Sequence, residues 1–167
     1  MSVIIINPNS TDTMTDVMLE VAQKAVPQLT FEGWTSHLAP PAIQGPEDGA
    51  EAEGHLLDLV QKAETQNAQA IIIGCFDDTA LKEASRRASC PVIGLGQAAY
   101  HFAAMRNWRF SVVTTLDVSV PILETNIHTY GLGGYLGKVR ASGVPVLALH
   151  ENSETCLLYT SPSPRDS

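Results

Sequence analysis

Short runs of apolar, β-branched residues alternate along the chain with longer stretches whose apolar residues recur at helical spacing. The short runs are typical of buried strands, and the longer stretches are typical of helices that cover a sheet. Strands are predicted at Val3–Ile6, Leu29–Thr35, Ala70–Ile73, Pro91–Leu95, Arg109–Val113 and Val144–Leu149. This alternation predicts βαβ units, and therefore an α/β protein built on parallel sheet.

The stretches between the strands carry ordinary helix signals. Asn9 or Ser10 can cap a helix that runs to about Val26. Further helices are predicted over Pro46–Gln66, Thr79–Ala88, Gln97–Met105 and Pro121–Tyr130. The glycine-rich segment 131–137 lacks the Lys-Ser/Thr ending of a phosphate loop and follows no predicted strand, so we interpret it as a flexible turn.

The most informative stretch is Gly74-Cys75-Phe76-Asp77-Asp78, which follows a predicted buried strand directly. It places a thiol between the carboxyl end of that strand and the amino end of a helix. Ligands bind at this edge of open α/β sheets, and a helix amino end favours a thiolate. Cys75 is therefore a candidate for chemistry. The alternative that stays open is a buried apolar filler, which is the usual place of a free cysteine.

Two other strand ends should lie on the same edge of the fold. One is Asn7-Pro8-Asn9-Ser10 and the other is Thr114-Thr115. Their amide and hydroxyl groups could bind a small polar ligand, and nearby helix amino ends could hold an oxyanion. Each also has a structural alternative, since Asn9, Ser10 and Asp78 could cap helices and the threonines could be ordinary strand residues.

Composition narrows the classes of function. The chain has 167 residues and a net charge of −8, which argues against nucleic acid or an anionic membrane as a partner. Three widely spaced cysteines without a CxxC pair predict neither a disulfide framework nor a structural zinc site. Cys90 precedes the predicted strand that begins at Pro91, at the edge opposite the candidate site, and is interpreted as structural. With no signal-peptide pattern and no apolar segment near ~20 residues, we expect a reduced, cytoplasmic protein.

The carboxyl-terminal run from Cys156 to Asp166 fits no element and resembles a translated sequencing adaptor. The alternative is a natural disordered tail rich in Pro and Ser. We expect residues 156–167 to be non-native and Cys156 to carry no chemistry. On this interpretation the native protein continues beyond Thr155.

Four blocks in the same order resemble the hydantoin racemase branch of the aspartate/glutamate racemase superfamily. They are Ile5–Ser10, Gly74–Asp78, Pro91–Gly94 and Phe110–Thr115, and the likeness runs from about residue 2 to about residue 150. The resemblance implies two flavodoxin/Rossmann-like parallel-sheet domains with the site between them. Here the first would be residues 1–96, and residues 97–155 would form an incomplete second domain.

The resemblance also implies the chemistry. Each domain contributes one cysteine, the first matching Cys75, and no cofactor or metal is used. Racemisation needs an acid and a base on opposite faces of a planar carbanion, and donors where enolate charge develops. Positions that match the substrate pocket are Asn9, Ser10, Phe76, Asp77, Thr114 and Thr115. Neutral Asn and Ser stand where amino-acid racemases of the superfamily have an acidic residue. This favours a neutral cyclic ureide, such as a 5-substituted hydantoin or allantoin, over an amino acid, although an amino-acid derivative stays possible.

The chain departs from the family in one respect. The second family cysteine lies in a later Gly-Cys motif, which neither Cys90 nor Cys156 matches. We therefore expect the chain alone to be almost inactive. The full-length form could be a homo-oligomer. The alternatives are a decarboxylase or cis-trans isomerase of the same superfamily, and a non-catalytic ligand-binding α/β module.

Overall fold

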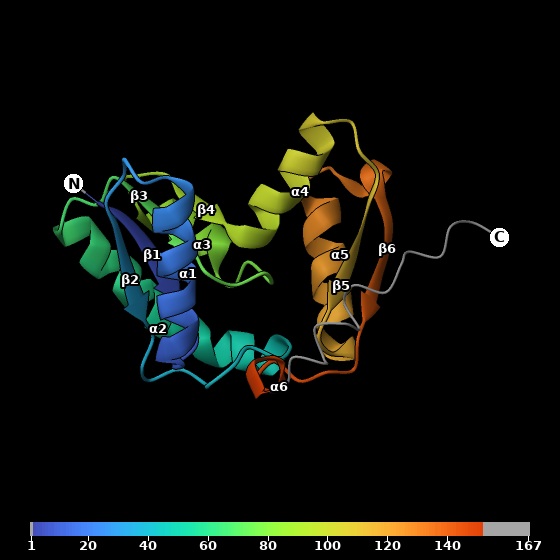
Figure 1. The fold of residues 1–167 in the computed structure, drawn as a ribbon, viewed down its shortest axis with the longest axis horizontal. Coiled ribbons are helices and arrows are strands. Elements are labelled where there is room, and N and C mark those ends of the chain that lie inside the picture. The colour runs from blue at the N-terminus through green and yellow to red at the C-terminus, as the bar shows by residue number, and fades with distance from the viewer. Residues whose placement is uncertain (1, 152–167) are drawn as a thin grey trace.

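The computed structural model describes residues 2–151, and these form two separate parallel sheets (Figure 1). The first sheet has four strands in the order β2-β1-β3-β4. They are β1 (Val3–Asn7), β2 (Phe31–Thr35), β3 (Ala70–Ile73) and β4 (Val92–Gly94). Every residue of β1 is buried, as expected for a central strand that is covered on both faces.

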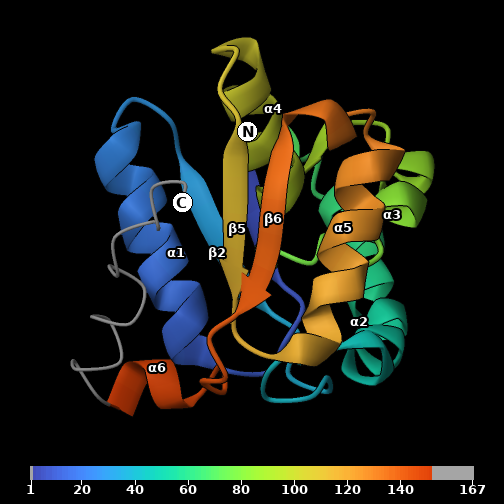
Figure 2. The ribbon, with the colours of Figure 1, turned by 90° about the vertical axis from the view of Figure 1, so that its right-hand side faces the viewer.

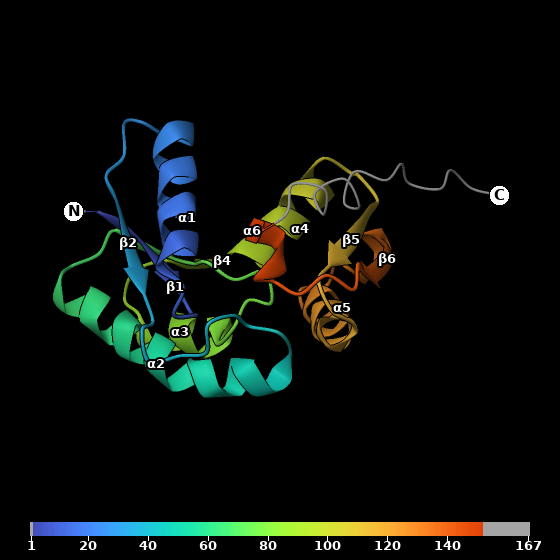
Figure 3. The ribbon, with the colours of Figure 1, turned by 60° about the horizontal axis from the view of Figure 1, so that its bottom comes forward.

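Three helices cover this first sheet. They are α1 (Asp12–Ala25), α2 (Pro46–Thr65) and α3 (Leu81–Arg87). In Figure 3, α1 lies on one face of the sheet, and α2 and α3 lie on the other. The main core forms on the α2 side, where apolar residues from strands and helices pack together: Ile4, Ile6, Leu56, Leu57, Val60, Ala63, Ile71, Ile73, Leu81 and Ala84.

The rest of the chain builds a second, smaller unit around a two-stranded parallel sheet, β5 (Phe110–Thr114) and β6 (Leu136–Ala141). Its helices are α4 (Leu95–Met105) and α5 (Val120–Thr129), with short 3-10 turns at Asp117–Ser119 and Gly133–Tyr135. The short helix α6 (Ala148–Glu151) follows β6 through a segment that returns to the first unit, where the backbone N–H of Val146 donates to Gln44 Oε1 at 3.1 Å. Its core contains Tyr100, Val112, Leu123, Ile127, Leu132 and Val139.

One face of this second sheet is left open by the part of the chain that the structure describes. In Figure 2, β5 and β6 face the viewer with no described helix in front of them. Val113 on β5 is accordingly 48% exposed. Parallel sheets normally have both faces covered, so within residues 2–151 only one of the two covering layers of this sheet is present.

The predicted last strand is wrong. Residues 144–149 do not form a strand but lead into α6, and the strand β6 begins inside the segment interpreted as a flexible turn. In β6 only Val139 is fully buried, while Lys138 and Arg140 are exposed. Because β6 is half-covered and at an edge, it lacks the continuous apolar run that marked the other strands.

The other predicted elements are present within a few residues of their expected bounds, but the first cap differs. Helix α1 begins at Asp12, with Thr11 rather than Asn9 or Ser10 in the capping position. The carboxamide oxygen of Asn9 accepts the backbone N–H of Thr11 at 2.9 Å, so Asn9 shapes the turn before the helix.

The interpretation of residues 156–167 as non-native concerns a segment outside the described residues.

Helix α4 leads from the first unit to the second, and its amino end is held by a residue far away in the chain. The backbone N–H groups of Gly96 and Gln97 donate to the two carboxylate oxygens of Asp78, at 3.0 and 2.7 Å. Asp78 therefore acts as a cap, as one interpretation of the sequence allowed, but for α4 rather than for the helix that follows it. The predicted domain boundary at residue 96 falls in this turn and stays a prediction.

None of the helices within residues 2–151 is long and apolar enough to span a bilayer.

The close approach at the start of α4 requires glycine at position 96. A Cβ there would clash with the carbonyl oxygen of Phe76 and lie 2.9 Å from Asp78 Oδ2. We expect Gly96→Ala to lower the free energy of unfolding in urea by about 1–3 kcal/mol, as overpacked sites do. The control is Gly54→Ala in α2, where a Cβ meets nothing within 4 Å and should add about 0.5–1 kcal/mol. Equal effects of the two substitutions would contradict the close packing described for Gly96.

Candidate active site

The structure brings the Cys75 loop and the Asn7–Ser10 loop to one edge of the first sheet. Strands β1 and β3 pair in parallel, with Ile6 opposite Ile73, so both strands end at the same level. The backbone N–H of Gly74 donates to the carbonyl oxygen of Ile6 at 2.8 Å. Two of the three predicted strand ends are therefore neighbours, as expected for the carboxyl edge of a parallel sheet.

The Asn7–Ser10 turn is held by a buried amide network that sequence reasoning missed. Asn7 is fully buried, and its side-chain nitrogen donates to Asn9 Oδ1 at 2.9 Å and to Thr15 Oγ1 at 3.0 Å. In return, Asn7 Oδ1 accepts the backbone N–H of Asn9 at 3.1 Å. The oxygen of the Asn9 carboxamide is thus committed to the turn. The partly exposed Ser10 hydroxyl bonds to no other residue of the described range, which leaves it available to a ligand.

The Cys75 thiol is half-buried, between the main core and a small cluster formed by Ala39, Ile43 and Ala52. Thr79 Oγ1 donates to its sulfur at 3.5 Å. Burial raises the pKa of the thiol to about 11, and the charge of Asp77 adds to the rise against the opposing hydrogen bond from Thr79. At neutral pH the group is a thiol.

The expectation of a favoured thiolate at a helix amino end is therefore wrong for this loop. Helix α3 begins only at Leu81, six positions after the cysteine, and it has just seven residues. The effect of a helix end is confined to about one turn, whereas the Asp77 carboxylate is close enough to act on the thiol.

Two carboxylates follow the thiol, and their surroundings differ. Burial raises the pKa of Asp77 to about 6; a hydrogen bond from Ser119 opposes the rise, and the charge of Asp78 adds to it. Burial also raises the pKa of Asp78, against hydrogen bonds from Tyr130 and from the first turn of α4. Both carboxylate oxygens of Asp78 accept hydrogen bonds from these donors, so Asp78 has a structural role. Asp77 is therefore the carboxylate that remains to interact with a ligand.

Phe76 belongs to a row of three aromatic rings. The residue is 42% exposed, and its ring meets Tyr100 edge-on with centroids 5.5 Å apart. Tyr100 stacks on Phe110, also at 5.5 Å. A cavity of about 280 Å³ beside these rings is lined mainly by apolar groups, and it extends along β5 to Val113. It could take an apolar substituent. Within residues 2–151 the buried hydroxyl of Tyr100 has no hydrogen-bond partner.

The predicted threonines lie at the carboxyl end of β5, in the second unit. Their carbonyl oxygens accept the backbone N–H groups of Ser142 and Gly143, which closes the turn after β6. Among the described residues, no hydrogen bond joins Thr114 or Thr115 to the Cys75 loop.

The second unit reaches the Cys75 loop through other residues. Ser119 Oγ lies 3.4 Å from Asp77 Oδ2, and Asn126 Nδ2 donates to the Asp77 carbonyl oxygen at 2.8 Å. A second cavity, of about 370 Å³, lies between the first turns of α2, residues 77–80 and α5. No sequence pattern pointed to these contacts. No group of three His, Cys, Asp or Glu side chains in the described ranges could hold a metal ion.

Comparison with known proteins shows which family this chain resembles. The sequence model of the Asp/Glu/hydantoin racemase family matches residues 3–159. Hydantoin racemase from Rhizobium meliloti is 41% identical over 155 residues, which cover 92% of this chain and 64% of the relative. Hydantoin racemase from Paenarthrobacter aurescens is 30% identical over 159 residues, covering 94% of this chain and 67% of the relative.

Among solved structures, allantoin racemase from Klebsiella pneumoniae superposes with a TM-score of 0.86 at 32% identity. The likeness covers 94% of this chain and 64% of that structure, so the chain spans less than two thirds of its length. The expected α/β fold with a partial second domain is thereby confirmed. The chain belongs to the Asp/Glu/hydantoin racemase family.

Proposed function

We propose that this chain is part of a cofactor-independent racemase of hydantoin-type substrates, with Cys75 as one of two catalytic thiols. The observation that carries the proposal is the position of Cys75, at the carboxyl edge of the first sheet and within reach of α5 in the second unit. The substrate class is a small cyclic ureide, such as a 5-substituted hydantoin or allantoin, and the names of the relatives support it. The proposal includes a cytoplasmic location and neither nucleic acid nor membrane as a partner.

The proposed reaction moves one proton at the carbon next to a carbonyl group. A base removes the proton from one face, the electron pair passes to the carbonyl as an enolate, and an acid returns a proton on the opposite face. Cys75 suits the acid role at neutral pH, because burial and the Asp77 charge keep its proton bound. The thiolate left after donation is the base for the reverse direction, so one residue serves both directions of the reaction.

The base on the other face is a second thiol, which the family resemblance places in a later Gly-Cys motif. Cys90 does not suit this role, since it precedes Val92 at the amino end of β4 and lies at the opposite edge of the sheet. Substrate contacts are assigned to Ser10, Phe76 and Asp77 on the first unit, with Asn9 holding the turn that carries Ser10. Thr114 and Thr115 complete the proposed pocket from the second unit.

We expect the chain of 167 residues to show almost no racemisation, because one thiol cannot serve both faces of the carbanion. The measurement is the loss of optical rotation of a single enantiomer of a 5-substituted hydantoin. The comparison is the same protein extended to the length of its relatives. Measurable racemisation by the 167-residue chain would contradict the two-thiol mechanism.

The extended protein should exchange the α-proton of its substrate in heavy water, and Cys75→Ser should slow this exchange by about 10²–10⁴-fold, the usual contribution of a general acid or base. Proton NMR of the substrate follows the exchange. The matched control is Cys90→Ser, which removes a thiol outside the proposed site and should retain the exchange rate. Undiminished exchange in Cys75→Ser would reject the proposed role of Cys75.

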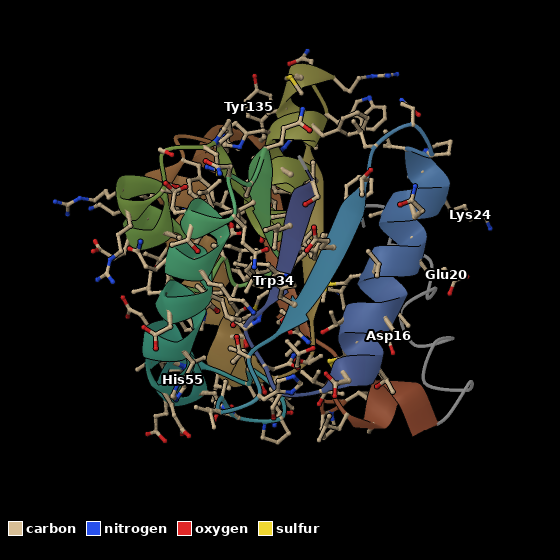
Figure 4. The ribbon with its side chains drawn as sticks, turned by 90° about the vertical axis from the view of Figure 1, so that its left-hand side faces the viewer. Asp16, Glu20, Lys24, Trp34, His55 and Tyr135 are labelled. Carbon is tan, nitrogen blue, oxygen red and sulfur yellow. The ribbon has the colours of Figure 1, made fainter. Side chains whose placement is uncertain are left out.

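Asp77→Asn should lower the pKa of the Cys75 thiol, because it removes a negative charge that disfavours the thiolate. Below the thiol pKa, alkylation by iodoacetamide should become about threefold faster or more, since each unit of pKa changes the thiolate fraction about tenfold. Mass spectrometry of the Cys75 peptide measures the rate from neutral to alkaline pH. Asp16→Asn is the control, an exposed carboxylate on the first turns of α1 (Figure 4). An unchanged profile in Asp77→Asn would show that Asp77 does not influence the thiol.

A further inference from the structure

We infer that helix α5 of the second unit positions the Cys75 loop, and that Asn126 and Tyr130 are positioning residues for the thiol. The inference rests on the proposed function only in so far as Cys75 is the catalytic group. The contacts themselves link two units that belong to different sheets and are far apart in sequence.

Asn126 holds the backbone next to the thiol. Its side-chain nitrogen donates to the carbonyl oxygen of Asp77 at 2.8 Å, across 49 residues of sequence. That carbonyl lies two residues after Cys75, so the bond restrains the chain on one side of the sulfur. Hydrogen bonds inside the loop are short-range, from the Asp78 N–H to the Cys75 carbonyl and from Thr79 to the sulfur, and they do not fix the loop against the rest of the molecule.

Tyr130 holds the carboxylate that follows. Its hydroxyl donates to Asp78 Oδ2 at 2.8 Å, across 52 residues. Its ring packs against both hydrophobic cores, which no other residue of the two described clusters does. Burial and the hydrogen bond to Asp78 raise the pKa of Tyr130, so the hydroxyl remains a donor.

The two positioning residues sit on a rigid support. Asn126 and Tyr130 are four residues apart, at the end of α5, and therefore lie on one side of the helix. Leu123 and Ile127 of the same helix are completely buried in the second core. A shift of the second unit would therefore move α5, and α5 would move the Asp77 carbonyl and the Asp78 carboxylate that it holds. Because these groups follow Cys75 directly in the chain, the position of the thiol would change with them.

The test uses the 167-residue chain and the alkylation of Cys75, with Cys90 in the same molecule as an internal reference. Asn126→Leu keeps the side-chain shape but removes the donor, and Tyr130→Phe removes a single oxygen. Matched controls are Thr125→Val, whose hydroxyl bonds within its own helix to Pro121, and Tyr135→Phe, whose ring packs on the second core alone.

Loosening the loop should hydrate the thiol, since burial is the main cause of its high pKa. We therefore expect each positioning variant to alkylate Cys75 about threefold faster or more, with a lower apparent pKa in the pH profile. Cys90 and both controls should keep the parent rates. Amide hydrogen exchange over residues 74–80 should quicken in parallel.

Two outcomes would overturn the inference. One is an unchanged pH profile of Cys75 alkylation in Tyr130→Phe. This variant is the milder of the two, and its result is decisive if Asn126→Leu does not fold. The other is an equal rise for Cys75 and Cys90, which would mean a general loss of stability. The outcome is independent of the proposed racemase activity, because retained proton exchange in Cys75→Ser would reject that activity and leave the alkylation result as it is.

Discussion

The carboxylate of Asp78 is the point on which the arrangement of the two units depends. It is buried, and it accepts hydrogen bonds from the backbone of Gly96 and Gln97 and from the hydroxyl of Tyr130. These donors come from the start of α4 and the end of α5. A buried carboxylate is costly unless such donors surround it, and removing one partner leaves the charge uncompensated. One side chain thus ties the loop after β3 to both helices that carry the second unit.

This contact also constrains the sequence around it. A Cβ at Gly94 would clash with the Asp78 carboxylate, and one at Gly96 would clash with the Phe76 carbonyl. The glycines at the β4–α4 junction are therefore there for close approach rather than for an unusual backbone angle, since neither has a positive φ. Burial of the Cys75 sulfur beside this contact is the main reason why the thiol holds its proton.

The sequence predicted features that depend on local patterns along the chain, and it did not predict contacts between residues far apart in the sequence. Strands β1 and β3 are continuous apolar runs because they are central, and their carboxyl ends lie side by side at one edge of the sheet, as predicted. Strand β6 escaped prediction because only its Val139 is fully buried and its exposed positions are charged. The contacts of Asn126 and Tyr130 span 49 and 52 residues, and no local pattern encodes which side chain meets a given loop.

The error about the thiol has the same origin and bears on how the site could work. Position in the sequence suggested a helix end that favours a thiolate, but α3 begins too far from the sulfur to act on it, and burial beside Asp77 disfavours the thiolate. In the proposed two-thiol mechanism, each thiol has to be able both to give and to take up a proton. Asp77, whose own pKa is raised to about 6, is partly able to take up a proton near neutral pH. Protonation of Asp77 would remove the charge that disfavours the thiolate, so a larger fraction of Cys75 would be ionised at a given pH without any movement of the loop.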